Sequence, residues 1–247
     1  VMDTILQAFK LAESVRLPVM AILDAFILSH TEEPVDVPEQ ALVDAYLPRY
    51  EPEWRLDVDD PRAFNMLVPP EYYMELRLKT QQAMEQAEPK ARAVDEEFGA
   101  RFGRHYGLLE PYRMEGAEVV LVAAGATTSI ARVAIDELRA EGVPIGLLKL
   151  RLFRPFPVAA VRQALAHVRK VAVVDRNFSF GLGGIFAAEL KAALYGLPKP
   201  PAVFGHIAGL GGRDINVADL RRVFGDLKRI AGGEPAGRLV TYLGVRE

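Results

Sequence analysis

Cysteine is absent from this sequence of 247 residues. Disulfide bonds, thiolate zinc sites, cysteine-ligated iron–sulfur clusters and a cysteine nucleophile are therefore excluded within the chain. No apolar run approaches the roughly 18 residues that a membrane-spanning helix needs, and no signal-peptide pattern opens the sequence. From these absences we expect a cytoplasmic protein with no membrane partner.

An excess of positive charge is also lacking. The formal net charge is −3 and the sequence pI is about 5.9, so nothing favours nucleic acid or an anionic membrane as a partner. Half of the residues are apolar and 26% are charged, as is usual for globular proteins. The length suffices for one large domain or two small ones.

The motifs of several common sites are missing too. The histidines show no HxH or HExxH spacing, so we expect no metal site. They are His30, His105, His167 and His206. Neither a Walker loop nor a nucleophile elbow is present. The dinucleotide fingerprint is incomplete, because Asp214 stands where the third glycine would follow Gly209 and Gly211.

The first part of the chain has the pattern of an α/β layer. Residues 3–14 have the apolar spacing of a helix. Residues 17–23 (LPVMAIL) form a short apolar run, typical of a strand buried on both faces. Because this layer begins inside a helix, without the strand that should precede it, we expect the N-terminal portion of the native chain to lie outside this sequence.

A proline-rich and acidic stretch follows. Its prolines predict an extended excursion over residues 29–70 with little regular structure. Irregular segments this long are usually functional loops or interface arms. Residues 71–98 return to helical spacing and predict a connector between two domains. Within it, Pro89 is expected to break or kink the helix.

Strands and helices alternate most clearly over residues 116–233. This alternation predicts an α/β domain with a doubly wound parallel sheet and right-handed crossovers. The predicted strands cover residues 118–123, 144–150, 170–174, 202–207 and 239–244. The predicted helices cover residues 127–140, 157–169, 184–195 and 216–230.

Four loops would leave the carboxyl ends of these strands, where open α/β sheets usually bind ligands or partners. They bring together charged residues at Arg151, Arg154, Asp175, Arg176, Arg213 and Asp214. They also carry glycines at Gly181, Gly183, Gly184, Gly209, Gly211 and Gly212. One interpretation is an anion site for a phosphate or carboxylate at helix N-termini. The other, which we favour, is that arginine and aspartate pair with each other and brace an interface.

A smaller group of polar residues follows the predicted N-terminal strand. His30 stands in the stretch DAFILSHTEEP, with Asp24 and Thr31 nearby. These three residues are candidates for a cleft that contacts a cofactor. Residues of this kind more often have a structural role than a functional one, and we favour a structural role for His30.

Several stretches, in this order along nearly the whole chain, resemble one enzyme family. They are TILQAFKLAE, LPVMAILDAFILSHTEEPV, EEFGARFGRHYGLLEPY, FRPFP, VAVVDRNFSFGLGG and GLGGRDI. The sequence is thereby similar to the C-terminal portion of the alpha subunit of pyruvate:ferredoxin oxidoreductase, within the 2-oxoacid:ferredoxin oxidoreductases. Ala25 departs from the pattern, since the family is expected to have glycine there.

The resemblance implies an organisation for the chain. Residues 1–60 would be the C-terminal part of a pyrimidine-binding domain for thiamine diphosphate, and residues 61–115 an extended and helical linker. Residues 116–233 would be a transketolase-C-terminal-like domain, followed by a tail at 234–247.

It also implies a chemistry. Such enzymes convert a 2-oxoacid and coenzyme A into an acyl-CoA and carbon dioxide while reducing ferredoxin. Thiamine diphosphate and Mg²⁺ would be shared with a partner subunit, and iron–sulfur clusters would belong to partners of the beta, gamma and delta types. No catalytic residue of the family matches a position in this chain, so we expect none here and no activity of the chain alone.

Other functions stay open at this point. The chain could belong to a 2-oxoglutarate or branched-chain 2-oxoacid:ferredoxin oxidoreductase. It could instead belong to another thiamine enzyme, such as a transketolase or a 2-oxoacid dehydrogenase beta subunit, although FRPFP and GLGGRDI argue against this. A third alternative is a non-catalytic α/β module that binds a ligand at the glycine-rich edge.

Overall fold

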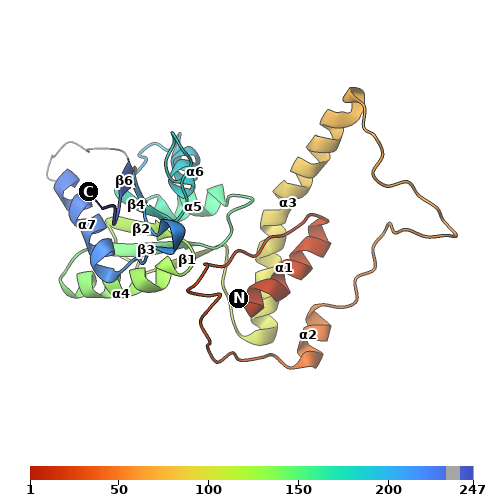
Figure 1. Ribbon diagram of the computed structural model, residues 1–247, viewed down its shortest axis with the longest axis horizontal. Coiled ribbons are helices and arrows are strands. Elements are labelled where there is room, and N and C mark those ends of the chain that lie inside the picture. Colours follow the sequence, from red (N-terminus) through yellow and green to blue (C-terminus); the bar gives the residue numbers. More distant parts are fainter. Residues whose placement is uncertain (232–239, 247) are drawn as a thin grey trace. The chain divides into compact units, whose positions relative to one another are not determined.

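The computed structural model describes residues 1–231 and 240–246 and divides into two compact units (Figure 1). A helical unit comprises residues 1–22 and 33–105. A sheet unit comprises residues 23–32 and the chain from residue 106 onward. The chain therefore passes between the units three times. The ten residues 23–32, called here the inserted segment, belong to the sheet unit although both flanks belong to the helical unit.

Among its described residues, the sheet unit has six strands in the order β1-β3-β2-β4-β5-β6. Every neighbouring pair is parallel except β1 and β3, which are antiparallel. The strands are β1 (Leu109–Tyr112), β2 (Val119–Ala123), β3 (Ile145–Leu150), β4 (Lys170–Asp175), β5 (Ala202–Ile207) and β6 (Val240–Tyr242). The helices are α4 (Thr127–Ala140), α5 (Val158–Leu165), α6 (Ile185–Leu194) and α7 (Val217–Ala231), with a 3₁₀ turn at Leu210–Gly212.

Side chains on the central strands alternate between two hydrophobic cores. Leu121 of β2 lies in the core that α4 and α7 cover. Its neighbours Val120 and Val122 lie in the core that α5 and α6 cover. All three side chains are fully buried, as expected for a parallel sheet covered on both faces. The predicted doubly wound sheet is thereby confirmed.

One edge strand was not predicted from the sequence. β1 falls within the stretch interpreted as linker and pairs antiparallel to β3, with Pro111 opposite Leu148. Proline has no N–H for a ladder hydrogen bond and is found in sheets mainly at edges. The proline at position 111 therefore argued against a strand in the sequence, although a strand at the edge of the sheet tolerates it. The predicted strand at 239–244 is present as β6, although Leu239, the predicted boundary at 233 and residues 234–238 lie outside the described residues.

The helical unit consists of α1 (Met2–Val15), α2 (Gln40–Tyr46) and α3 (Pro70–Phe102). Apart from α2, residues 33–69 have no regular helix or strand, as the prolines predicted. Pro89 was predicted to break or kink the connector helix, and a break is wrong, because α3 continues through it. A proline inside a helix removes one backbone hydrogen bond and costs about 3 kcal/mol. Packing of α1 along α3, which buries Ala87 and Ala91, offsets this cost.

The predicted strand at residues 17–23 is also wrong. Residues 18–24 have no regular structure, and the side chains of Met20 and Ile22 are 84% and 80% exposed. A strand must pair its backbone N–H and C=O groups with a neighbouring strand. Within the described residues, all strands belong to the sheet unit, so this segment has no neighbour to pair with. Its apolar residues therefore remain at the surface.

An aromatic cluster joins α2 to α3. Tyr46 is fully buried, and its ring lies edge-on to Phe98 and Phe102. Its hydroxyl donates a hydrogen bond to the Val94 carbonyl at 3.1 Å, and Lys10 of α1 donates to the Tyr46 carbonyl at 2.7 Å. All three helices of the unit thus meet at one residue. Of the helices described, none has the length and apolar character needed to cross a membrane.

This cluster makes Phe98 a test of the helical unit. Phe98 is fully buried, so Phe98→Ala is expected to lower the free energy of unfolding by about 3–5 kcal/mol. Chemical denaturation followed by circular dichroism measures the change. Tyr72→Ala on the same helix is the matched control, because Tyr72 is 65% exposed and its loss should cost about 0.5 kcal/mol or less. Similar losses in both variants would contradict the packing described.

Candidate functional site

The carboxyl edge of the sheet has a topological switch point between β2 and β4. The chain leaves β2 through α4 on one face of the sheet and leaves β4 toward α6 on the other face. Loops that diverge in this way leave a crevice between them, where doubly wound proteins bind their ligands. In this protein the inserted segment lies at that crevice and contributes Asp24 to it.

Asp24 joins three distant parts of the sheet unit. Its Oδ2 accepts a hydrogen bond of 2.5 Å from the backbone N–H of Ala126, the residue that precedes α4. Its Oδ1 accepts one of 2.9 Å from Nη1 of Arg176, just after β4. Both side chains are less than one-fifth exposed. A carboxylate is favoured here because the N-terminal end of a helix and a guanidinium both carry positive charge.

The loop after β2 is shaped around this carboxylate. Gly125 has a φ of +62°, in the left-handed region that glycine adopts most readily. A Cβ at this position would lie 2.2 Å from Oδ2 of Asp24. Glycine is therefore required both by the backbone conformation and by the close approach of Asp24.

The N-terminus of α6 is occupied by side chains of the preceding loop. Asp175 is completely buried and accepts hydrogen bonds from the N–H groups of Phe186 and Ala187, at 2.9 and 3.1 Å. Asn177 accepts a third from the N–H of Ile185 at 2.8 Å. Burial raises the pKa of Asp175 above its ordinary value, and these amide hydrogen bonds oppose the rise.

Close packing accompanies this helix cap. A Cβ on Gly184 would lie 1.9 Å from Oδ2 of Asp175. The glycine-rich loop therefore lets the chain cap its own helix. An external anion at α6 would have to displace Asp175 and Asn177.

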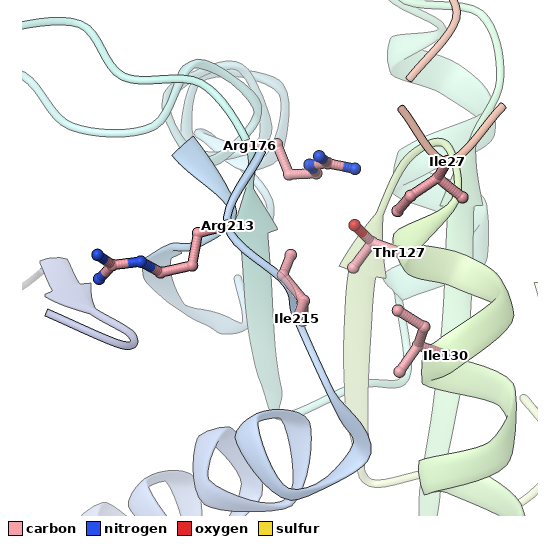
Figure 2. A pocket seen from close by; sticks show the side chains of 6 residues that line it. All are labelled: Ile27, Thr127, Ile130, Arg176, Arg213 and Ile215. Carbon is pink, nitrogen blue, oxygen red and sulfur yellow. The ribbon is translucent and has the colours of Figure 1, made fainter. Parts of the chain in front are cut away.

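The four predicted loops do lie at one edge of the sheet, because β2, β3, β4 and β5 run parallel. Their arginines have separate partners. Arg151 donates to the Gly107 carbonyl at 2.9 Å, and Arg154 pairs with Glu189. Arg176 and Arg213 line one cavity, but Figure 2 shows the Arg213 side chain turned away from it.

Among the hydrogen bonds described, Asp175 and Asp214 do not pair with these arginines, and the bracing of an interface stays a prediction. Arg213 donates to the Gly244 carbonyl, and both Arg213 and Asp214 are exposed. Asp175 instead bonds backbone amides. Neighbours in sequence point to different sides of a loop, and backbone groups compete well for a buried carboxylate. Whether Gly181, Gly183, Gly211 or Gly212 contacts a partner stays a prediction.

Of the three cleft candidates in the inserted segment, only Asp24 enters the crevice. His30 is exposed, its Nδ1 lies 2.8 Å from the Ser29 hydroxyl, and its ring stacks on Phe26. The Thr31 hydroxyl donates to the carbonyl of Ile27 one turn earlier. A contact of His30 or Thr31 with a cofactor stays a prediction.

Sequence reasoning missed Thr127 and Ile27, which line the cavity beside Arg176 (Figure 2). Thr127 begins α4 and is 1% exposed, and its Oγ1 has no hydrogen-bond partner. Its place just after the predicted strand 118–123 was the available signal. No signal in the sequence indicated the pairing of Asp24 with Arg176, because the two residues are 152 positions apart.

Comparison with known proteins was made for the whole chain. Residues 1–96 match the family model described as pyruvate flavodoxin/ferredoxin oxidoreductase, thiamine diP-binding. Residues 117–220 match the model described as pyruvate:ferredoxin oxidoreductase core domain II.

Two curated relatives illustrate the similarity. Pyruvate synthase subunit PorA of Methanothermobacter thermautotrophicus is 42% identical over 248 residues, which cover 100% of this chain and 62% of the relative. Ketoisovalerate oxidoreductase subunit VorA of Pyrococcus horikoshii is also 42% identical, over 93% of this chain and 59% of the relative. The chain thus spans about three-fifths of the length of these relatives.

Among solved structures, 2-oxoglutarate:ferredoxin oxidoreductase from Magnetococcus marinus is similar with a TM-score of 0.42 and 23% identity. The match covers 60% of this chain and 23% of that one.

The buried carboxyl of Asp175 predicts a pH dependence of stability. Because its pKa is raised in the folded chain, the folded state binds more protons than the unfolded state between the ordinary and the raised pKa. The free energy of unfolding contributed by Asp175 therefore falls as pH rises through that window. Urea unfolding is measured for the wild type and for Asp175→Asn from about pH 4 to about pH 7. As pH rises, the free energy of unfolding of the wild type should fall relative to that of the variant. A difference that is constant, or that grows with pH, would contradict this cause.

Proposed function

The chain belongs to the pyruvate:ferredoxin oxidoreductase family, and from that premise we propose that it is part of an alpha subunit that acts only with partner subunits. The proposed reaction converts pyruvate and coenzyme A into acetyl-CoA and carbon dioxide while oxidised ferredoxin is reduced. The observation that carries the proposal is that two models of the same family match residues 1–96 and 117–220. We place the complex in the cytoplasm.

The described residues do not form a thiamine diphosphate site by themselves. The amides that begin α6 are taken by Asp175 and Asn177. Across residues 1–231 and 240–246, no group of three or more His, Asp or Glu is arranged to hold a metal ion such as Mg²⁺. We therefore assign no chemical step to these residues. In the proposal, a partner subunit holds the diphosphate and Mg²⁺, and this chain provides a wall of the cofactor cleft.

Electron transfer to ferredoxin is likewise assigned to partners. Iron–sulfur clusters are held by cysteine thiolates, and this chain has no cysteine. Partner subunits of the beta, gamma and delta types would supply the clusters. Coenzyme A would be the second substrate of the complex.

A second candidate differs only in the substrate. A relative named as a ketoisovalerate oxidoreductase subunit has the same 42% identity to this chain as the pyruvate synthase subunit, over 93% of the chain instead of 100%. A branched-chain 2-oxoacid is therefore the main competitor of pyruvate. The structure offers no separate support for 2-oxoglutarate as the substrate.

The test starts from the complex isolated from its native cell by a tag on this chain. Mass spectrometry identifies the subunits, and coenzyme A-dependent reduction of ferredoxin is measured with each 2-oxoacid. We expect an iron–sulfur partner and a kcat/KM for pyruvate about tenfold or more above that for 3-methyl-2-oxobutanoate, since pockets discriminate by this much per added carbon group. The isolated chain should be inactive. Preference for the branched substrate would support the second candidate, and absence of any iron–sulfur partner would overturn both.

The proline-rich arm (residues 33–69) is proposed as a surface for a partner subunit. It exposes many large apolar side chains, far more than scattered surface residues would explain. They are Val35, Val37, Leu42, Tyr50, Trp54, Leu56, Val58, Phe64, Met66 and Leu67. Val58 and Leu67 are more than 90% exposed.

Limited proteolysis tests this surface. If a partner covers the arm, cleavage within residues 33–69 should be slower in the complex than in the free chain, on the order of tenfold or more, because the partner blocks access of the protease to the backbone. Mass spectrometry of the fragments locates the cuts. Equal cleavage rates in the two samples would show that the arm is not part of the assembly surface.

A further inference from the structure

Three hydrogen-bond donors converge on the crevice between β2 and β4. They are the backbone N–H of Ala126, the guanidinium of Arg176 and the hydroxyl of Thr127. The first two are satisfied by the two oxygens of Asp24. Thr127 differs from both, because its Oγ1 is buried without a hydrogen-bond partner. A buried polar atom of this kind requires an explanation, and a ligand group or a water beside it is one.

The space around these donors has two parts that share Arg176. The enclosed part, which Thr127 lines, has a volume of about 10 Å³, on the scale of a single water molecule. Figure 2 shows Arg176, Ile27 and Thr127 facing this space. The open part is a cleft of about 450 Å³, lined by Arg176, Gly209, Gly211 and Gly212 together with the inserted segment. Pockets for small molecules have volumes of roughly 300–1,000 Å³.

Apart from Asp24, the inserted segment meets the sheet unit through the apolar side chains of Ile27, which lines the enclosed cavity, and Phe26, which lies near Gly212. Phe26 and Ile27 remain 62% and 41% exposed. Its own hydrogen bonds are local, from Leu28 N–H to the Asp24 carbonyl and from His30 N–H to the Phe26 carbonyl. The carboxylate of Asp24 is therefore the main polar link between this segment and the crevice.

We propose that this crevice is a binding site for the anionic group of a small molecule, a carboxylate or a phosphate, and that Asp24 occupies it in this structure as a tethered competitor. The ligand's anionic group takes the position of the Asp24 carboxylate, between Ala126 N–H and Arg176, and extends toward Thr127, whose hydroxyl Asp24 does not engage. The rest of the ligand lies in the cleft above the three glycines. Binding releases the inserted segment. This inference concerns the sheet unit alone and does not depend on the proposed reaction.

Direct binding to the full chain tests the site. Asp24→Ala removes the competitor, so isothermal titration should show inorganic pyrophosphate binding about tenfold or more tightly than to the wild type, as expected when a site is blocked about nine-tenths of the time. Pyruvate is titrated in parallel, and the tighter of the two probes identifies phosphate or carboxylate as the preferred group. Asp60→Ala, which removes an exposed aspartate of the arm, is the matched control and should bind as the wild type does.

Two double variants show whether the proposed donors hold the anion. Adding Arg176→Ala or Thr127→Val to Asp24→Ala should reverse the gain in affinity, more strongly for Arg176→Ala because it removes the charge. Folding of each variant is checked by circular dichroism. A folded Asp24→Ala chain that binds neither probe more tightly than the wild type would overturn the proposal.

The wild-type chain provides a second measurement that needs no substitution. Hydrogen exchange of the peptides covering residues 23–32 and Ala126 is followed with and without saturating pyrophosphate and pyruvate. Displacement of Asp24 should speed exchange in residues 23–32 by about tenfold while Ala126 stays protected. If Asp24→Ala does not fold, unchanged exchange in the wild type with both probes would overturn the proposal on its own.

Discussion

The arrangement of the carboxyl edge depends on one ion pair, between Asp24 and Arg176. The aspartate lies in residues 23–32, which belong to the sheet unit although the residues on both sides of them belong to the helical unit. The arginine follows the central strand β4. The same carboxylate holds the N–H that precedes α4. Removing one member of such a largely buried pair leaves the other charge uncompensated, which typically costs about 3–5 kcal/mol. The position of the loop after β2 and that of residues 23–32 are therefore linked.

Two of the helix N-termini at this edge, those of α4 and α6, are satisfied in different ways. α6 is capped from its own loop, by Asp175 and Asn177, within 12 residues of the amides that they bind. The amide before α4 is satisfied from a distance of 102 residues, by Asp24. The first cap forms whenever the loop and helix form together. The second cap also requires residues 23–32 to pack against the loop after β2, so it depends on a contact between positions far apart in the sequence.

The sequence predicted the part of the fold that local patterns control. From the α/β alternation after residue 116, the bounds of α4 were predicted correctly. The bounds of the central strands were predicted to within a residue or two, because parallel strands are apolar on both faces. Residues 17–23 had the same apolar pattern but no neighbouring strand, so the pattern alone misled. At the site, the loops could be predicted from their places after the strands. Asp24 could not be assigned to Arg176, because no local pattern encodes a contact between distant positions.

The three passages of the chain between the units affect how the protein can be divided. Neither unit is continuous in sequence, so a cut at the third passage, between His105 and Tyr106, does not release a complete sheet unit. The fragment that begins at Tyr106 would have a guanidinium and a helix-end amide facing solvent where a carboxylate had been. Such a fragment could be completed by a separate peptide of residues 23–32. The ten residues thus act as a removable piece of the fold, and the two parts could serve as a complementation pair.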